Sequence, residues 1–224
     1  MSIEDLSAEI AACRACERLV AWREAVAADP PKRYRGERYW ARPVPGFGDP
    51  KARIVIVGLA PAANGANRTG RMFTGDRSGD WLYAALHRAG LANQAEAVSA
   101  DDGLRLDDTY VTATVRCAPP DNKPTVDERD RCVPFLAREL ALLTRARVIV
   151  ALGAFGWDGA LRGLAANGVP TPRPKPKFAH GAETQVGELT MLGSYHVSQQ
   201  NTFTGRLTEP MLDAVFARAK VLAG

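Results

Sequence analysis

Three polar side chains of types found in enzyme active sites each follow a segment that predicts a buried strand. Asp76 lies in the glycine-rich stretch 58–80, Asn122 in RCAPPDNKPT, and His196 in SYHVSQQNT. The carboxyl ends of parallel strands meet at one edge of a sheet, where ligands bind in such folds. We therefore expect one cleft that contains these side chains. Each also has a structural interpretation, because acids at helix starts, single histidines after strands and Pro-rich connectors are common without any catalytic role.

The stretch 58–80, GLAPAANGANRTGRMFTGDRSGD, leaves the first strand and enters a helix near Ser78. Its small residues allow a ligand to approach the backbone closely. It contains neither GxxxxGK[ST] nor GxGxxG, so a nucleotide-phosphate loop is an alternative without a specific motif. Arg68 and Arg71 are candidates for phosphate contact, and Phe73 offers a flat apolar face to a planar ring.

The cysteines form one C-x-x-C pair and two distant single residues, namely Cys13, Cys16, Cys117 and Cys132. Disulfides are rare in cytosolic proteins, whereas four thiolates are a complete ligand set for one metal centre. The structural alternative is a helical C-x-x-C with two unrelated core cysteines. We favour the metal centre because no cysteine is left over. The spacing does not choose between zinc and an iron–sulfur cluster.

Four apolar, β-branched segments predict buried strands, at residues 53–58, 109–115, 147–152 and 188–195. Helical patterns lie between and after them, at residues 79–89, 128–144, 154–166 and 210–222. This alternation predicts a mostly parallel sheet covered by helices on both faces. The 224 residues fit a single domain, 1–224, whose N-terminal segment carries two of the candidate metal ligands.

The composition limits the class of protein. The chain is 46% hydrophobic and has a net charge of +4. It contains no apolar run long enough for a membrane helix and no apolar segment typical of a secretion signal, so we expect a cytoplasmic protein. Loops rich in Pro and basic residues are predicted at 29–50 and 168–181. Nine Lys/Arg against four Asp/Glu between residues 18 and 53 fit either nucleic-acid contact or a solvated surface.

The cysteine pattern and three motifs together resemble the uracil-DNA glycosylase superfamily, specifically its family 5 branch. The motifs are VIVGLAPAANGANRTGRMFTGDRSGDWL, VRCAPPDNKPT and HVSQQNTFTGRLT, in that order along most of the chain. The resemblance implies an α/β/α sandwich around a four-stranded, mainly parallel sheet. It also implies that the four cysteines hold a structural [4Fe–4S] cluster.

The resemblance further implies a monofunctional enzyme that flips uracil, or another deaminated or damaged base, out of DNA and hydrolyses its glycosidic bond. Asp76 is then the carboxylate that positions water, Asn122 its partner, and His196 the residue that faces the departing base. The implied substrate-binding residues are Gly58, Ala60, Ala62, Asn64, Arg68 and Phe73, with the Phe73 ring stacked on the flipped base.

Some positions define the branch and others depart from it. Ala60 and Ala113 stand where other branches carry Asp and Asn, which is typical of family 5 and fits relaxed base selection. Asn64 stands where family 5 chains usually have His, and an amide cannot carry a proton at neutral pH. The KRRIH-type insert of relatives that trap their substrate covalently is absent, so we expect turnover, by a monomer.

Two other function classes remain open from the residues themselves. The first is a non-catalytic nucleic-acid-binding protein with a structural metal centre. The second is a nucleotide-binding enzyme whose segments are crosslinked by a zinc ion.

Overall fold

The computed structural model describes residues 1–224 and contains one mixed sheet of six strands in the order β1-β3-β2-β4-β6-β5. The four central strands run parallel to one another. They are β3 (Thr109–Ala113), β2 (Ile54–Gly58), β4 (Val148–Leu152) and β6 (Leu189–Ser194). These are the four strands that the apolar segments predict, and the α/β fold class is confirmed.

The expectation of only four strands was incomplete, because one antiparallel strand lies at each edge of the sheet. The two-residue strand β1 (Phe47–Gly48) pairs with β3, and β5 (Glu183–Val186) pairs with β6. Neither edge strand has an apolar run. β1 lies inside a Pro- and Gly-rich stretch, and β5 is mostly polar and exposed, so their pairing partners rather than their own residues define them.

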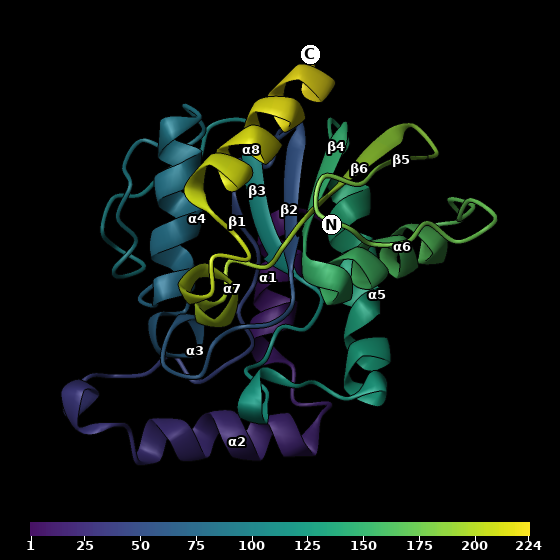
Figure 1. Ribbon diagram of the computed structural model, residues 1–224. Coiled ribbons are helices and arrows are strands. Elements are labelled where there is room, and N and C mark those ends of the chain that lie inside the picture. The colour runs from purple at the N-terminus through teal and green to yellow at the C-terminus, as the bar shows by residue number, and fades with distance from the viewer.

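Helices cover both faces of the sheet and form the expected three layers (Figure 1). One face packs against α4 (Arg77–Arg88) and α8 (Glu209–Ala223), and the other against α5 (Val126–Leu142) and α6 (Gly153–Ala166). Successive strand residues point to opposite faces, so Ile56 joins the α4/α8 core while Val57 joins the α5/α6 core. No helix has the length and apolarity that crossing a bilayer would require.

Helices α2, α3 and α7 lie beyond one end of the sheet (Figure 1). The remaining elements are α1 (Ile3–Ala12), α2 (Glu17–Ala28), α3 (Ala66–Thr69), α7 (Gln199–Phe203) and the 3-10 turns η1 (Lys32–Tyr34) and η2 (Pro120–Asn122). The polar segment after His196 forms the short helix α7. Helix α4 begins at Arg77, two residues before the predicted start at residue 79, and Asp76 caps it.

Arg71 is a poor candidate for phosphate contact, because it forms a buried ion pair. Its two terminal nitrogens donate to the two carboxylate oxygens of Asp102 over 2.8 and 2.7 Å. The side chains of Arg71 and Asp102 are 4% and 7% exposed. Asp102 also accepts hydrogen bonds from the backbone N–H groups of Val98, Ser99 and Leu104, so the pair fixes the loop between α4 and β3.

Removing Asp102 should destabilise the protein strongly, because the buried Arg71 would keep its charge without a partner. We expect Asp102→Ala to lower the free energy of unfolding by about 3–5 kcal/mol. Urea unfolding followed by circular dichroism measures this change. The matched control is Asp101→Ala, whose side chain is exposed and bonds only to Ser99. Equal stability of the two variants would contradict a structural role for the pair.

Candidate functional site

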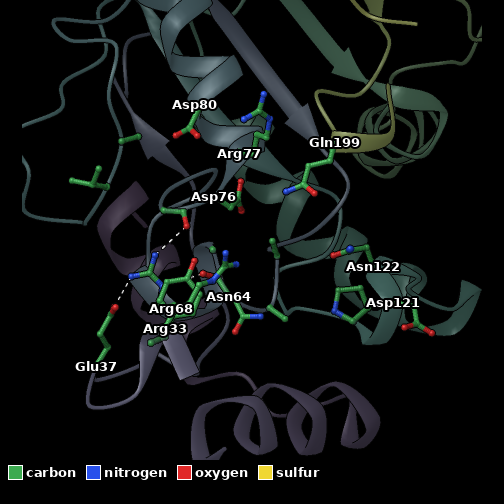
Figure 2. Close-up of a pocket in the computed structure, with 18 of the residues that line it drawn as sticks. Arg33, Glu37, Asn64, Arg68, Asp76, Arg77, Asp80, Asp121, Asn122 and Gln199 are labelled. Carbon is green, nitrogen blue, oxygen red and sulfur yellow. Dashed lines mark hydrogen bonds and ion pairs between the residues drawn. The ribbon is translucent and has the colours of Figure 1, made fainter. Parts of the chain in front are cut away.

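Two adjoining pockets open at the carboxyl ends of the central strands. The inner pocket, of about 560 Å³, extends from the segment after β2 to His196. The outer pocket, of about 770 Å³, extends toward η1 and α2 and is drawn in Figure 2. Both pockets share a wall made of Ala62, Asp76, Arg77, Asp121, Asn122 and Gln199. The two pockets therefore form one continuous cleft.

The three predicted polar side chains share the inner pocket. Asp76 comes from the N-cap of α4, Asn122 from η2 after β3, and His196 from the segment after β6. Figure 2 shows Asp76 near the centre of the cleft and Asn122 on its opposite wall. The expected cleft at the sheet edge is present, and three segments far apart in sequence contribute to it.

The carboxylate of Asp76 is held in place by the start of α4. Its Oδ1 accepts a hydrogen bond from the Gly79 backbone N–H over 3.0 Å. A side chain at Gly65 would put its Cβ 1.9 Å from Oδ2 of Asp76, so only glycine leaves room for the carboxylate. Burial raises the pKa of Asp76 above its usual value, and hydrogen bonds from the N–H groups of Gly79 and Ser78 only partly offset this effect.

His196 is neutral at physiological pH. Burial lowers its pKa to about 4, because the inner pocket does not solvate an imidazolium. Its ring lies 6.1 Å from the Phe73 ring, centroid to centroid, with the planes tilted by 37°. A neutral imidazole still donates one hydrogen bond, so His196 combines a donor with an apolar neighbour.

The Phe73 ring rests on the end of β2. A Cβ at Gly58 would lie 2.7 Å from the ring carbon Cζ of Phe73, so glycine there makes the contact possible. Phe73 has a φ of 52°, which is unfavourable for a bulky residue and typical of functional sites. Among the predicted substrate-binding residues, Ala60, Ala62 and Phe73 line the inner pocket. Gly58 does not line it.

The loop that carries Asn122 has two consecutive residues in the left-handed region. Asp121 and Asn122 have φ values of 52° and 54°. Asp and Asn tolerate this conformation better than other residues with side chains, which gives a local reason for this pair. Both side chains line the cleft. Sequence reasoning identified Asn122 but not Asp121, although the adjacent carboxylate was a visible signal.

Asn64 and Arg68 line the outer pocket and not the inner one. Asn64 Oδ1 accepts a hydrogen bond from the hydroxyl of Tyr39 over 2.8 Å. The guanidinium of Arg68 donates to Glu37 over 2.6 Å and to the carbonyls of Asn64 and Gly75 over 3.0 Å each (Figure 2). Its charge is already paired, so Arg68 supports the wall of the pocket and is not a free phosphate ligand.

Among the other residues of the cleft, Arg77 was missed from the sequence, whereas the rest lie in segments that the sequence singled out, namely the motif after His196 and the basic loop 29–50. Arg77 and Gln199 line both pockets, and Arg33 and Tyr34 line the outer one. Neither Arg33 nor Arg77 forms an ion pair, and each guanidinium lies over an aromatic ring, 4.6 Å from the Tyr34 centroid and 4.7 Å from that of Phe203. The position of Arg77 directly after Asp76 was a usable signal, and the predicted basic loop 29–50 contained Arg33 without indicating that it lies at this cleft.

The cysteines line a third, largely apolar pocket beside α2, and all four are free of disulfide bonds: Cys13, Cys16, Cys117 and Cys132. Arg23 Nη1 donates to Cys117 Sγ over 2.9 Å, and the Arg116 backbone N–H donates to Cys132 Sγ over 3.3 Å. Burial raises the pKa of Cys117 to about 11 and that of Cys132 to about 12, so without a metal both are neutral thiols.

This donor set fits a group that takes four thiolates. The four cysteines line one small pocket, its walls include apolar side chains such as Leu19 and Val115, and N–H groups donate to two of the sulfurs. No group of three or more His, Cys, Asp or Glu side chains is arranged to hold a single metal ion.

The sequence of the chain matches one known family of proteins. A family model described as the Uracil DNA glycosylase superfamily matches residues 45–220. This range contains the whole sheet, both layers of helices and every predicted catalytic residue. The chain belongs to the uracil-DNA glycosylase superfamily.

Full-length relatives define the branch. A type-5 uracil-DNA glycosylase of Mycobacterium tuberculosis is 57% identical over 225 residues, which cover 100% of this chain and 82% of the relative. The type-5 enzyme of Mycobacterium leprae is 55% identical over 100% of this chain and 96% of the relative. The type-5 enzyme of Thermus thermophilus is 53% identical over 96% of this chain and 95% of the relative. The chain is therefore a member of the type-5 branch.

The low pKa of His196 gives a direct test of the site. We expect its imidazole resonances to stay constant from pH 8 down to about pH 5.5 and to titrate near pH 4, because burial disfavours the charged ring. Two-dimensional ¹H–¹⁵N spectra of the imidazoles measure this, and His196→Gln assigns the signals. A midpoint near the ordinary value of about 6.5 would show that water solvates the pocket.

Proposed function

We propose that this protein is a monofunctional DNA glycosylase that releases uracil from DNA by hydrolysing the N-glycosidic bond. The observation that carries the proposal is the placement of Asp76, Asn122 and His196 around one pocket. Identities of 53–57% to type-5 uracil-DNA glycosylases over nearly the whole chain support it. They do not favour a non-catalytic nucleic-acid binder, because these full-length relatives are all named as glycosylases.

The substrate base must leave the duplex to reach this pocket. Flipping costs a few kcal/mol, and least for a mispaired base such as uracil opposite guanine. The Phe73 ring then provides an apolar stacking surface. The walls at Ala60 and Ala62 carry no groups that read base edges, which fits acceptance of other deaminated or damaged bases, including hypoxanthine and xanthine.

The pocket suits a reaction in which positive charge develops on the sugar and negative charge on the base. Ionised Asp76 stabilises the sugar cation and orients a water molecule, and Asn122 holds that water from the opposite wall. Neutral His196 donates a hydrogen bond to the departing base anion. Such fixed groups are effective because the site excludes most water. Water adds to the sugar carbon, and its proton ends on the free base.

The DNA strand has a path through the outer pocket. Arg33 and Arg77 are cations without carboxylate partners on this path, Lys123 is exposed and lines the inner pocket, and Arg206 is an exposed cation on the segment between α7 and α8. Contacts of such groups to phosphates hold DNA without reading its sequence. A protein that acts in this way meets its substrate on chromosomal DNA in the cytoplasm.

We also propose that the four cysteines hold a [4Fe–4S] cluster, with zinc as the alternative. The ligands come from the connection between α1 and α2, from the segment after β3, and from α5. When bound, the group supplies a rigid crosslink among these three segments. Cys117 lies five residues before Asn122, so the crosslink would also anchor the loop that carries this side chain.

Removing the side chain of either Asp76 or His196 should abolish most base release without unfolding the protein. We expect Asp76→Ala and His196→Ala each to lower the single-turnover rate on a uracil-containing duplex at least about 100-fold. Alkaline cleavage of the abasic product measures release, and Asp107→Ala and His87→Ala, both exposed and outside the cleft, serve as controls. Rates near those of the parent in both site variants would refute these roles.

The acid limb of the pH–rate profile should report Asp76. Its raised pKa means that the ionised form is lost at a higher pH than for an ordinary aspartate, so the rate should fall as the pH drops through that pKa. His196 stays neutral until about pH 4 and does not contribute above pH 5. We expect Asp76→Asn to remove the limb from the residual activity. An unchanged limb would assign it to another group.

Gly65→Ala should act through Asp76. The new Cβ would collide with the carboxylate, so we expect a loss of base release approaching that of Asp76→Ala. A double-mutant cycle tests this mechanism, because Gly65→Ala should add almost nothing in the Asp76→Ala background. Additive losses in the double variant would mean that Gly65→Ala disturbs some other part of the site.

The metal proposal is tested by elemental analysis. We expect the purified protein to be brown and to contain about four iron and four sulfide per chain. Cys16→Ser and Cys117→Ser should each lose most of this iron, because each removes one of four thiolates. A colourless protein that contains zinc without sulfide would favour the alternative.

A further inference from the structure

Arg23 on α2 is a buried cation without a carboxylate partner. The residue is 1% exposed and forms no ion pair within 4.0 Å. Its Nη1 donates to Cys117 Sγ over 2.9 Å, its Nη2 donates to the Cys13 carbonyl over 3.3 Å, and its Nε has no partner. A guanidinium stays charged in proteins, so its burial without an anion nearby is unfavourable.

The surroundings of the cysteines carry excess positive charge. The charged residues that line this pocket are Arg14, Arg23, Arg116, Arg131 and Glu128. Ion pairs neutralise Glu128 through Arg18, Arg116 through Glu139, and Arg14 through Glu24. Arg131 is exposed and donates to the Ala15 carbonyl. Arg23 is therefore the one buried, uncompensated charge, and it points at the sulfurs.

Four neutral thiols would leave Arg23 without a counter-charge, whereas four metal-bound thiolates supply one. A centre with four thiolates around either a divalent zinc ion or a doubly charged iron–sulfur core has a net negative charge. We propose that Arg23 is the buried counter-charge of the four-cysteine centre and stabilises its thiolate form. This inference rests on the proposed metal centre and assigns to Arg23 a positioning role beyond metal ligation.

The backbone of Arg23 connects the same centre to the catalytic cleft. Its carbonyl accepts a hydrogen bond over 3.3 Å from Asn67 Nδ2, which also donates to the Ala63 carbonyl. Asn67 is fully buried on α3, which directly follows Asn64 and Gly65 in the chain. The thiolate centre thus holds Arg23 from one side, and Arg23 supports the wall of the Asp76 site from the other.

Charge and packing are separated by comparing Arg23→Lys with Arg23→Gln in the metal-loaded protein. Lysine keeps the positive charge, and glutamine keeps polarity and much of the bulk without charge. We expect Arg23→Gln to lose its metal to a chelator at least about tenfold faster than the parent, and Arg23→Lys to stay within about threefold. Arg14→Gln, at an exposed pair on the same pocket, is the control and should match the parent.

Reduction potential gives a second measurement, and comparing the charged with the uncharged replacement at the same position isolates the effect of charge on it. Reduction adds negative charge to an iron–sulfur centre, so loss of a nearby cation should shift the potential to more negative values in Arg23→Gln but little in Arg23→Lys. Equal behaviour of the two variants, including failure of both to fold, would overturn the inference. So would parental metal retention in Arg23→Gln. Metal content and base release of the parent protein test the proposed function separately.

Discussion

The site depends on a carboxylate held where its ionised form is costly. Asp76 caps α4 through the Gly79 N–H, and burial raises its pKa. The cap keeps the charged group in place, because a helix N-terminus attracts negative charge. The missing side chain at Gly65 leaves the space that the carboxylate occupies. One local structure therefore combines a structural cap with the reactive charge, so neither can be changed alone.

Burial has opposite effects on the two principal groups of the inner pocket. It raises the pKa of Asp76 and lowers that of His196 to about 4. Both shifts disfavour charge, yet their consequences for chemistry differ. The histidine becomes a neutral hydrogen-bond donor at all physiological pH values. The carboxylate keeps its charge only because backbone N–H groups and the start of α4 favour it. A poorly solvated pocket thus assigns different roles to the two groups.

Polar contacts add to apolar packing in holding the segments outside the sheet. Arg71 and Asp102 fix the loop between α4 and β3, and Arg68 ties the wall of the outer pocket to Glu37. Arg23 and Asn67 connect α2 to α3. Loops generally have lower local stability than the sheet, and such contacts restrict them. The cleft keeps its shape because these bonds anchor its walls to the rigid sheet.

The sequence by itself determined the four central strands, the helices between them and the polar residues after each strand. These follow from local rules of apolar periodicity and turn chemistry, and the motif order identified the superfamily. Only the tertiary structure determined which of the arginines near the cleft have a carboxylate partner and which do not. Arg68 and Arg71 have the same local character as Arg33 and Arg77, but the first two meet carboxylates from distant loops and the last two do not. Edge strands β1 and β5 and the burial of Arg23 likewise depend on partners far along the chain, which no local pattern encodes.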